Sequence, residues 1–124
     1  MPTVLIVENN EASRDTLARS LELHQYSVIL AADALEGISI ARAAKPDLIL
    51  MDLQLQGVDG WEATARLKMD KETEHIPIIA LSANAMPNDR HQALAAGGDD
   101  FDTKPVQFER LIEKIERLLV KMGP

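Results

Sequence analysis

Short apolar runs alternate along the chain with longer segments in which apolar residues recur at helical spacing. The runs VLIV and LILM are apolar at every position, which is typical of parallel strands that helices cover on both faces. The pattern predicts five strands, at Thr3–Val7, Ser27–Ala31, Asp47–Asp52, Ile76–Leu81 and Asp99–Asp102.

Helical patterns fill the gaps between these strands. The clearest pattern belongs to the last segment, whose apolar stripe consists of Phe108, Leu111, Ile112, Ile115, Leu118, Leu119 and Met122. Earlier helices are expected over 11–24, over 34–45, after Gly60, and from near Pro87 to Gly97-Gly98. Asp33 is placed to cap the second helix, with Glu36 three residues on as in a capping box. Pro46 then ends that helix.

Five strand–helix units in alternation predict a parallel sheet with helices on both faces. Right-handed crossovers leave few topologies, and five strands suit the doubly wound, flavodoxin-like order 2-1-3-4-5. With 124 residues, the chain is expected to form one α/β domain over 1–124. In such sheets the active crevice lies beyond the carboxyl ends of the strands.

Composition and charge narrow the class of protein. The chain has no cysteine, which excludes a disulfide framework and a thiolate metal site. Thirteen Lys and Arg against 20 Asp and Glu give a net charge of −7, which disfavours direct binding to nucleic acid. No apolar run is long enough to span a bilayer, and MPTVLIVENN does not resemble a leader peptide. We therefore expect a cytoplasmic protein without membrane insertion.

The residues at the predicted strand ends carry the candidate chemistry. They are Glu8-Asn9-Asn10, Asp52, Ser82 and Lys104. Acids, a hydroxyl and a cation at one sheet edge indicate phosphoryl transfer with an aspartate nucleophile and a hard divalent cation. A carboxylate and a phosphoryl donor are both anionic, so Mg²⁺ is needed to neutralise their approach, and one or two carboxylates suffice to bind it. Attack by Asp52 would give an acyl phosphate.

Four segments resemble, in order and spacing, the receiver domains of two-component signalling. They are LIVEN, PDLILMDLQLQGVDG, IPIIALSANAM and GGDDFDTKPV. The resemblance covers essentially the whole chain and agrees with the five predicted strands.

The resemblance implies a role for each strand-end residue. Asp52 matches the phosphoacceptor, and Glu8 matches the first acid of the metal-binding pair. The backbone carbonyl of Gln54 matches the remaining protein ligand to Mg²⁺, for which Mn²⁺ could substitute. Ser82 matches the switch hydroxyl, and Lys104 matches the lysine that binds the acceptor or its phosphate.

The resemblance also implies a switch and its partners. Lys104-Pro105 matches the family's cis peptide, and Phe101 occupies the position of the aromatic that turns inward when Ser82 moves. The expected phosphodonor is a histidine kinase or a histidine phosphotransfer protein. The signal would pass to a downstream protein through the fourth helix, fifth strand and fifth helix. Such a receiver takes part only in its own phosphorylation and dephosphorylation, so it is not an enzyme in the usual sense.

One position departs from the family's pattern. The second acid of the metal-binding pair, normally an aspartate, is Asn9. An amide oxygen can still coordinate Mg²⁺ but brings no charge, so affinity for the ion should fall. Asn10 is expected to cap the first helix, whereas Asn9 suits either a cap or a ligand. Asn9 therefore keeps open an alternative, a pseudo-receiver that binds partners without phosphorylation.

Two other proteins on similar sheets do not fit the first strand end. A flavodoxin needs a phosphate-cradling loop of Gly, Ser and Thr there, whereas Glu8-Asn9-Asn10-Glu11 would repel phosphate. A haloacid-dehalogenase-type phosphatase carries an Asp-x-Asp pattern at that place, and this chain has Glu-Asn-Asn.

Overall fold

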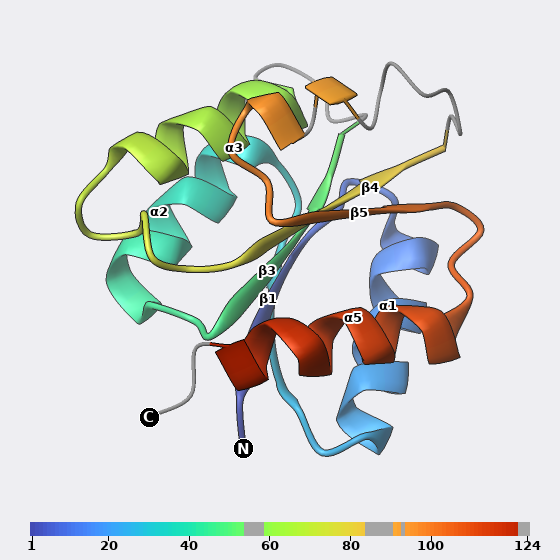
Figure 1. Cartoon of the computed structure of the whole chain (residues 1–124). Coiled ribbons are helices and arrows are strands. Elements are labelled where there is room, and N and C mark those ends of the chain that lie inside the picture. The colour runs from blue at the N-terminus through green and yellow to red at the C-terminus, as the bar shows by residue number, and fades with distance from the viewer. Residues whose placement is uncertain (54–58, 84–90, 93, 122–124) are drawn as a thin grey trace.

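A five-stranded parallel sheet runs through the middle of the molecule (Figure 1), in the order β2-β1-β3-β4-β5. The computed structural model describes residues 1–53, 59–83, 91–92 and 94–121. The strands are β1 (Thr3–Val7), β2 (Ser27–Ala31), β3 (Leu48–Asp52), β4 (Ile78–Ser82) and β5 (Asp100–Thr103). The predicted flavodoxin-like order is confirmed.

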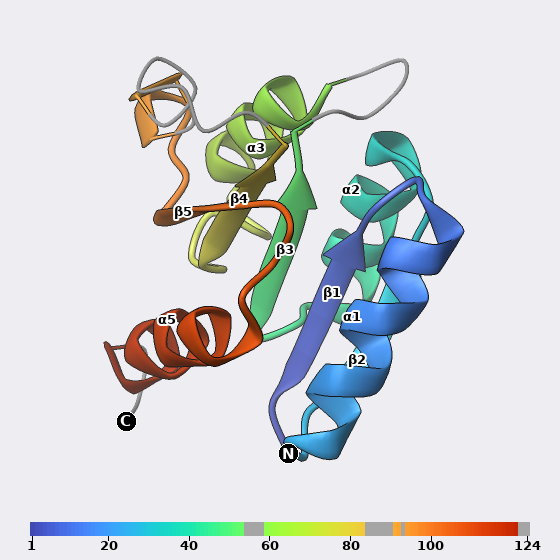
Figure 2. The ribbon, with the colours of Figure 1, turned by 90° about the vertical axis from the view of Figure 1, so that its right-hand side faces the viewer.

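Helices cover both faces of the sheet, as the fully apolar central strands require. They are α1 (Glu11–Leu23), α2 (Ala34–Ala44), α3 (Gly60–Met69) and α5 (Phe108–Lys121). Figure 2 shows α1 and α5 on one side of the strands and α2 and α3 on the other. The predicted start of a helix near Pro87 lies outside the described residues. Residues 91–92 and 94–95 are helical, and the chain leaves this turn through Gly97 at φ 105°.

Asn and Asp residues cap the N-termini of α1, α2 and α3. Asn10 caps α1, Asp33 caps α2 and Asp59 caps α3, each by accepting a hydrogen bond from a backbone N–H in the first turn. Such caps typically contribute about 1 kcal/mol each. The caps at Asn10 and Asp33 were predicted. The second helix ends at Ala44, just before Pro46 as expected, with its C-cap Lys45 at φ 48°.

Some strand boundaries differ from the predicted ones by one or two residues. The fourth strand begins at Ile78, because Pro77 has no N–H to donate to the ladder. The N–H of Ile78 instead donates to the Asp99 carboxylate at 2.8 Å. The third and fifth strands each begin one residue later than predicted, and the fourth ends at Ser82. Ser82 is thus the last residue of β4.

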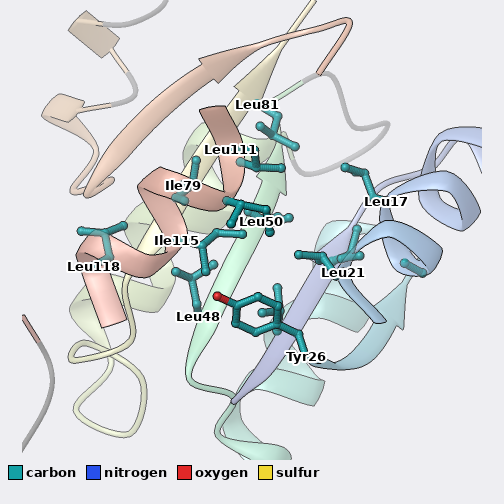
Figure 3. Packing of buried hydrophobic residues seen from close by; sticks show 14 residues of the cluster. Leu17, Leu21, Tyr26, Leu48, Leu50, Ile79, Leu81, Leu111, Ile115 and Leu118 are labelled. Atoms are coloured by element: carbon teal, nitrogen blue, oxygen red, sulfur yellow. The ribbon is translucent and has the colours of Figure 1, made fainter. Parts of the chain in front are cut away.

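The larger core cluster lies between the sheet and the helices α1 and α5 (Figure 3). Its members include the predicted stripe residues Leu111, Ile112, Ile115 and Leu118 of α5. A second cluster fills the opposite face beneath α2 and α3. Burial of each Leu or Ile contributes about 1.5–3 kcal/mol, so the two clusters hold the strand ends in fixed register. Met122, the last residue of the predicted stripe, lies outside the described residues.

A helix that crosses a bilayer must be both long and apolar. Within the described ranges, no helix has both the length and the apolar character that a membrane span needs.

Candidate functional site

The carboxyl ends of four neighbouring strands carry the candidate site. Glu8 follows β1, Asp52 ends β3, Ser82 ends β4 and Lys104 follows β5. The sheet order places these four strands side by side. Residues 96 positions apart in the sequence therefore meet, as the contact between Lys104 and Glu8 demonstrates.

Lys104 joins the two carboxylates of the site. Its Nζ lies 2.6 Å from Glu8 Oε1 and 3.3 Å from Asp52 Oδ2. Both carboxylates are only 2% exposed, whereas the lysine side chain is 23% exposed. One ammonium thus faces two buried acids, and the pocket keeps an excess of negative charge when both acids are ionised.

The pKa of Glu8 reflects this excess. Burial raises the pKa of Glu8 above its ordinary value, and a hydrogen bond and charge repulsion from Asp52 raise it further. Lys104 acts in the opposite direction through its own hydrogen bond and charge. The net rise means that the pocket disfavours a second negative charge unless a cation compensates it.

The backbone of Glu8 is held from two sides. Its N–H donates to the carbonyl of Ala31 at 3.0 Å, and its carbonyl accepts from Nη1 of Arg14 at 3.0 Å. The N–H of Asn10 also approaches Glu8 Oε2 at 3.4 Å. The contribution of Arg14 was not predicted, because an arginine on an amphipathic helix gives no sequence signal of a contact to a particular carbonyl.

The backbone of Asp52 lies against the first residue of α3. A Cβ added to Gly60 would lie 2.3 Å from the Asp52 carbonyl oxygen and 2.7 Å from Leu53 Cα. Only glycine allows this approach, so Gly60 fixes how closely α3 packs against the backbone of Asp52. From the sequence alone, Gly60 predicted only the start of a helix.

Ser82 and Phe101, the residues that match the family's switch, lie on the neighbouring strands β4 and β5. Ser82 is fully buried, and its carbonyl accepts the N–H of Lys104 at 2.8 Å. The Lys104-Pro105 bond is cis, as predicted. Phe101 is 5% exposed and belongs to a small cluster completed by Leu53, Ala80 and Trp61. The ring of Phe101 is therefore packed on the face opposite α5.

The donor set suits a hard divalent cation. Glu8 and Asp52 offer two carboxylates that share one ammonium, and carboxylate oxygens are ligands that Mg²⁺ prefers. Asn9 follows Glu8 directly and is exposed, while the cap of α1 is Asn10. Gln54 lies outside the described residues. Within the part of the chain that the structure describes, no three His, Cys, Asp or Glu side chains gather into a metal-binding group.

A groove of about 340 Å³ opens from the two charged residues between α1 and the segment after β5. Its lining residues are Glu8, Ala12, Ser13, Thr16, Leu17, Lys104, Pro105 and Val106. Most of them are apolar or uncharged. The groove reaches Glu8 and Lys104 from the side of α1.

A flavodoxin-like sheet with a buried aspartate, a second acid and a lysine at its strand ends is the arrangement expected of the receiver class of signalling domains. Comparison with known proteins agrees with this class. The model of the response regulator receiver domain matches residues 4–116, and the chain belongs to this family.

Curated relatives include a response regulator and a transcriptional regulator. The polar-differentiation response regulator DivK of Brucella anthropi is 40% identical over 117 residues, covering 94% of this chain and 95% of DivK. The DNA-binding dual master transcriptional regulator RpaA of Synechocystis is 36% identical over 119 residues, covering 96% of this chain. The match covers 49% of RpaA, so this chain spans about half of that relative.

Solved structures of receiver domains share the fold. A two-component response regulator from Clostridium difficile superposes with a TM-score of 0.92 at 27% identity, with 100% of both chains covered. The receiver domain of the sensor histidine kinase PA1611 from Pseudomonas aeruginosa has a TM-score of 0.88 at 33% identity, covering 95% of this chain and 97% of that one. That domain was crystallised with a magnesium ion coordinated in its active-site cleft.

The raised pKa of Glu8 predicts how stability depends on pH. A raised pKa means that the folded state holds the proton more tightly than the unfolded state, so this group's contribution falls as pH rises from the ordinary value of 4.5 through the raised one. Without divalent cations, we expect Glu8→Gln to melt at a higher temperature than the wild type at about pH 8. The difference in melting temperature should largely disappear at about pH 4, where Glu8 is mostly protonated in both states.

The control is Glu113→Gln, which removes one charge from an exposed position in the middle of α5. It should show no comparable change between the two pH values. A Glu8→Gln protein less stable than the wild type at both pH values would show that the ion pair outweighs the excess charge.

Proposed function

We propose that this chain is a phosphorelay receiver in which Asp52 accepts a phosphoryl group from a phosphohistidine. The observation that carries the proposal is the buried carboxylate pair of Glu8 and Asp52, joined to Lys104 at 2.6 Å and 3.3 Å. An Asp52 oxygen forms the new bond to phosphorus as the phosphorus–nitrogen bond of the phosphohistidine breaks. The electron pair of the broken bond stays on the imidazole nitrogen. The product is an aspartyl phosphate.

Each neighbouring group has a part in this step. Lys104 directs its ammonium at the acceptor and would pair with a phosphoryl oxygen. Glu8 and Asp52, with Asn9 and the carbonyl of Gln54, would hold Mg²⁺, which neutralises the charge on the phosphoryl oxygens. Ser82 is the last residue of β4, and its hydroxyl would donate to another oxygen once phosphate is present.

Phosphorylation would then act as a switch. Movement of Ser82 toward the phosphate would make room for a shift of Phe101, whose ring packs against Trp61. The surface near β5 and α5 would shift between two populations and change its affinity for a downstream protein. The protein takes part only in its own phosphorylation and dephosphorylation, and we place this cycle in the cytoplasm.

Asn9 favours a second candidate function. With an amide in place of the second acid, the pocket holds two carboxylates and one ammonium, so Mg²⁺ would bind more weakly. A pseudo-receiver would keep the fold and bind its partners without a phosphoryl group. The two functions differ in one measurable property, the uptake of phosphate at Asp52.

Intact mass after incubation with acetyl phosphate and Mg²⁺ separates these functions. The wild type should gain one phosphoryl group, whereas Asp52→Asn should gain none because the nucleophile is absent. Asp15→Asn, which replaces an exposed acid on α1, should gain phosphate as the wild type does. No uptake by the wild type, with uptake restored in Asn9→Asp, would establish the pseudo-receiver. Uptake by Asp52→Asn at the wild-type rate would refute the proposed acceptor.

The groove beside α1 supports a protein phosphodonor that docks next to the carboxylates. Thr16 is exposed and lines this groove, so Thr16→Arg should obstruct a docked protein without touching the carboxylates. We expect transfer from a phosphorylated histidine phosphotransfer protein to fall about tenfold, equivalent to about 1.4 kcal/mol. Uptake from acetyl phosphate should stay within about twofold.

The matched control is Ser20→Arg, one turn further along the same helix and outside the groove lining. It should transfer like the wild type from both donors. Equal losses from both donors in Thr16→Arg would mean that the pocket itself was damaged, and equal retention would argue against docking at this groove.

A further inference from the structure

A second buried carboxylate lies on β5, outside the acceptor pair. The side chain of Asp102 is only 2% exposed. Its strand position pairs with Leu81 of β4, a member of the core cluster that α5 covers. An apolar residue would be the ordinary choice at such a position, because burying a charge costs several kcal/mol unless the charge is paired.

Two cations of α5 compensate this charge. Arg110 donates from Nε to both carboxylate oxygens at 3.0 and 3.2 Å, and its Nη2 lies 2.5 Å from Oδ1. Nζ of Lys114 lies 3.6 Å from Oδ2. The hydrogen bond from Arg110 to Asp102, together with the attraction of their charges, raises the pKa of Arg110 above its usual range. We call Asp102, Arg110 and Lys114 the α5 clamp.

The α5 clamp also holds the neighbouring backbone of β5. Nζ of Lys114 donates to the carbonyl of Phe101 at 2.5 Å. The Asp102 carboxylate accepts the N–H of Thr103 at 2.7 Å. Three consecutive residues, 101–103, are thereby fixed to α5 immediately before Lys104.

The position of the Lys104 side chain depends on residues 101–103, which precede it on β5. Its N–H donates to the carbonyl of Ser82 at 2.8 Å, which continues the ladder between β5 and β4. Its side chain then crosses to the carboxylates of Glu8 and Asp52. A shift of the end of β5 would move the ammonium relative to both acids, and the ammonium lies only 2.6 Å from the nearer one.

From these contacts we infer that Asp102 is a positioning residue for phosphoryl acceptance, acting through Arg110 and Lys114 to fix the end of β5 that presents Lys104. This inference rests on the proposed function for its consequence and on the contacts of the α5 clamp for its geometry. Replacing an ion pair by apolar residues often leaves stability unchanged or higher, so a role in position is the better account of a buried charge here.

The chain offers a closely matched control for this inference. Asp100 lies two residues earlier on the same strand, is 18% exposed, and is 3.9 Å from Lys114. Like Asp102, it accepts the backbone N–H of the next residue, at 2.8 Å. Asp100→Asn and Asp102→Asn therefore remove the same charge from the same face, but only the second removes the bonds to Arg110.

The first readout needs neither metal nor phosphate. It is the hydrogen exchange rate of the Lys104 amide, measured by NMR. Asp102→Asn should increase this rate about tenfold relative to the wild type, through easier local opening. Asp100→Asn should stay within about twofold, and the amides of β4 residues 79–81 should stay protected in both variants. Arg110→Gln should reproduce the effect of Asp102→Asn, and it keeps the test available if the latter does not fold.

The second readout is the rate of phosphoryl uptake from acetyl phosphate at saturating Mg²⁺. We expect Asp102→Asn and Arg110→Gln to be about fivefold slower than the wild type, a change of about 1 kcal/mol. The double variant should be no slower than either single one, because both remove the same interaction. Asp100→Asn should match the wild type.

The two readouts separate the possible failures. Unchanged exchange at Lys104 in Asp102→Asn, or an equal increase in Asp100→Asn, would overturn the inference while leaving the proposed function intact. Faster exchange with normal uptake would show that the α5 clamp is structural only, which also overturns it. If the wild type takes up no phosphate but exchange follows the expected pattern, the proposed function fails and the positioning of Lys104 by the α5 clamp stands.

Discussion

The site depends on the contact of one lysine with two buried carboxylates. Lys104 lies 2.6 Å from Glu8 and 3.3 Å from Asp52, and both acids are almost withdrawn from water. Burial weakens the screening of their repulsion, and the raised pKa of Glu8 is the result. Two buried acids that share one ammonium lower the free energy of unfolding. Proteins commonly keep such a destabilising arrangement where their function requires it. A cation and a phosphoryl group would each change the balance of charge in this pocket.

The parallel sheet is what makes this contact possible. Each βα unit returns the chain to the same end of the sheet, so residues after β1, β3 and β5 converge although they are far apart in sequence. This is why the site could be predicted from the sequence. The fully apolar runs VLIV and LILM revealed β1 and β3, with Glu8 and Asp52 at their ends. The alternation of strands and helices then predicted the fifth strand, just before Lys104. The cap at Asn10 was predicted from the local sequence, whereas the cis bond before Pro105 was predicted from the resemblance to receiver domains.

Other features could not be predicted, because they depend on distances between segments. The space behind the Asp52 carbonyl requires glycine at position 60, but a glycine before a helical pattern predicts only a helix start. Arg14 reaches the Glu8 carbonyl, and Asp102 is buried beneath α5. Charged residues of this kind are normally read as exposed. The apolar pattern predicted that the fourth strand begins at Ile76. It begins at Ile78, because Pro77 has no N–H to donate to the neighbouring strand.

The proposed function requires that Asp52 is the phosphoacceptor. Borohydride reduction of the phosphorylated protein tests this requirement most directly. Borohydride converts an aspartyl phosphate to homoserine, which peptide mass spectrometry locates in the sequence. The account predicts homoserine at position 52 and at no other aspartate, in the wild type treated with acetyl phosphate and Mg²⁺. A reduced residue at another buried acid, such as Asp102, or a stable adduct that yields no homoserine, would contradict it.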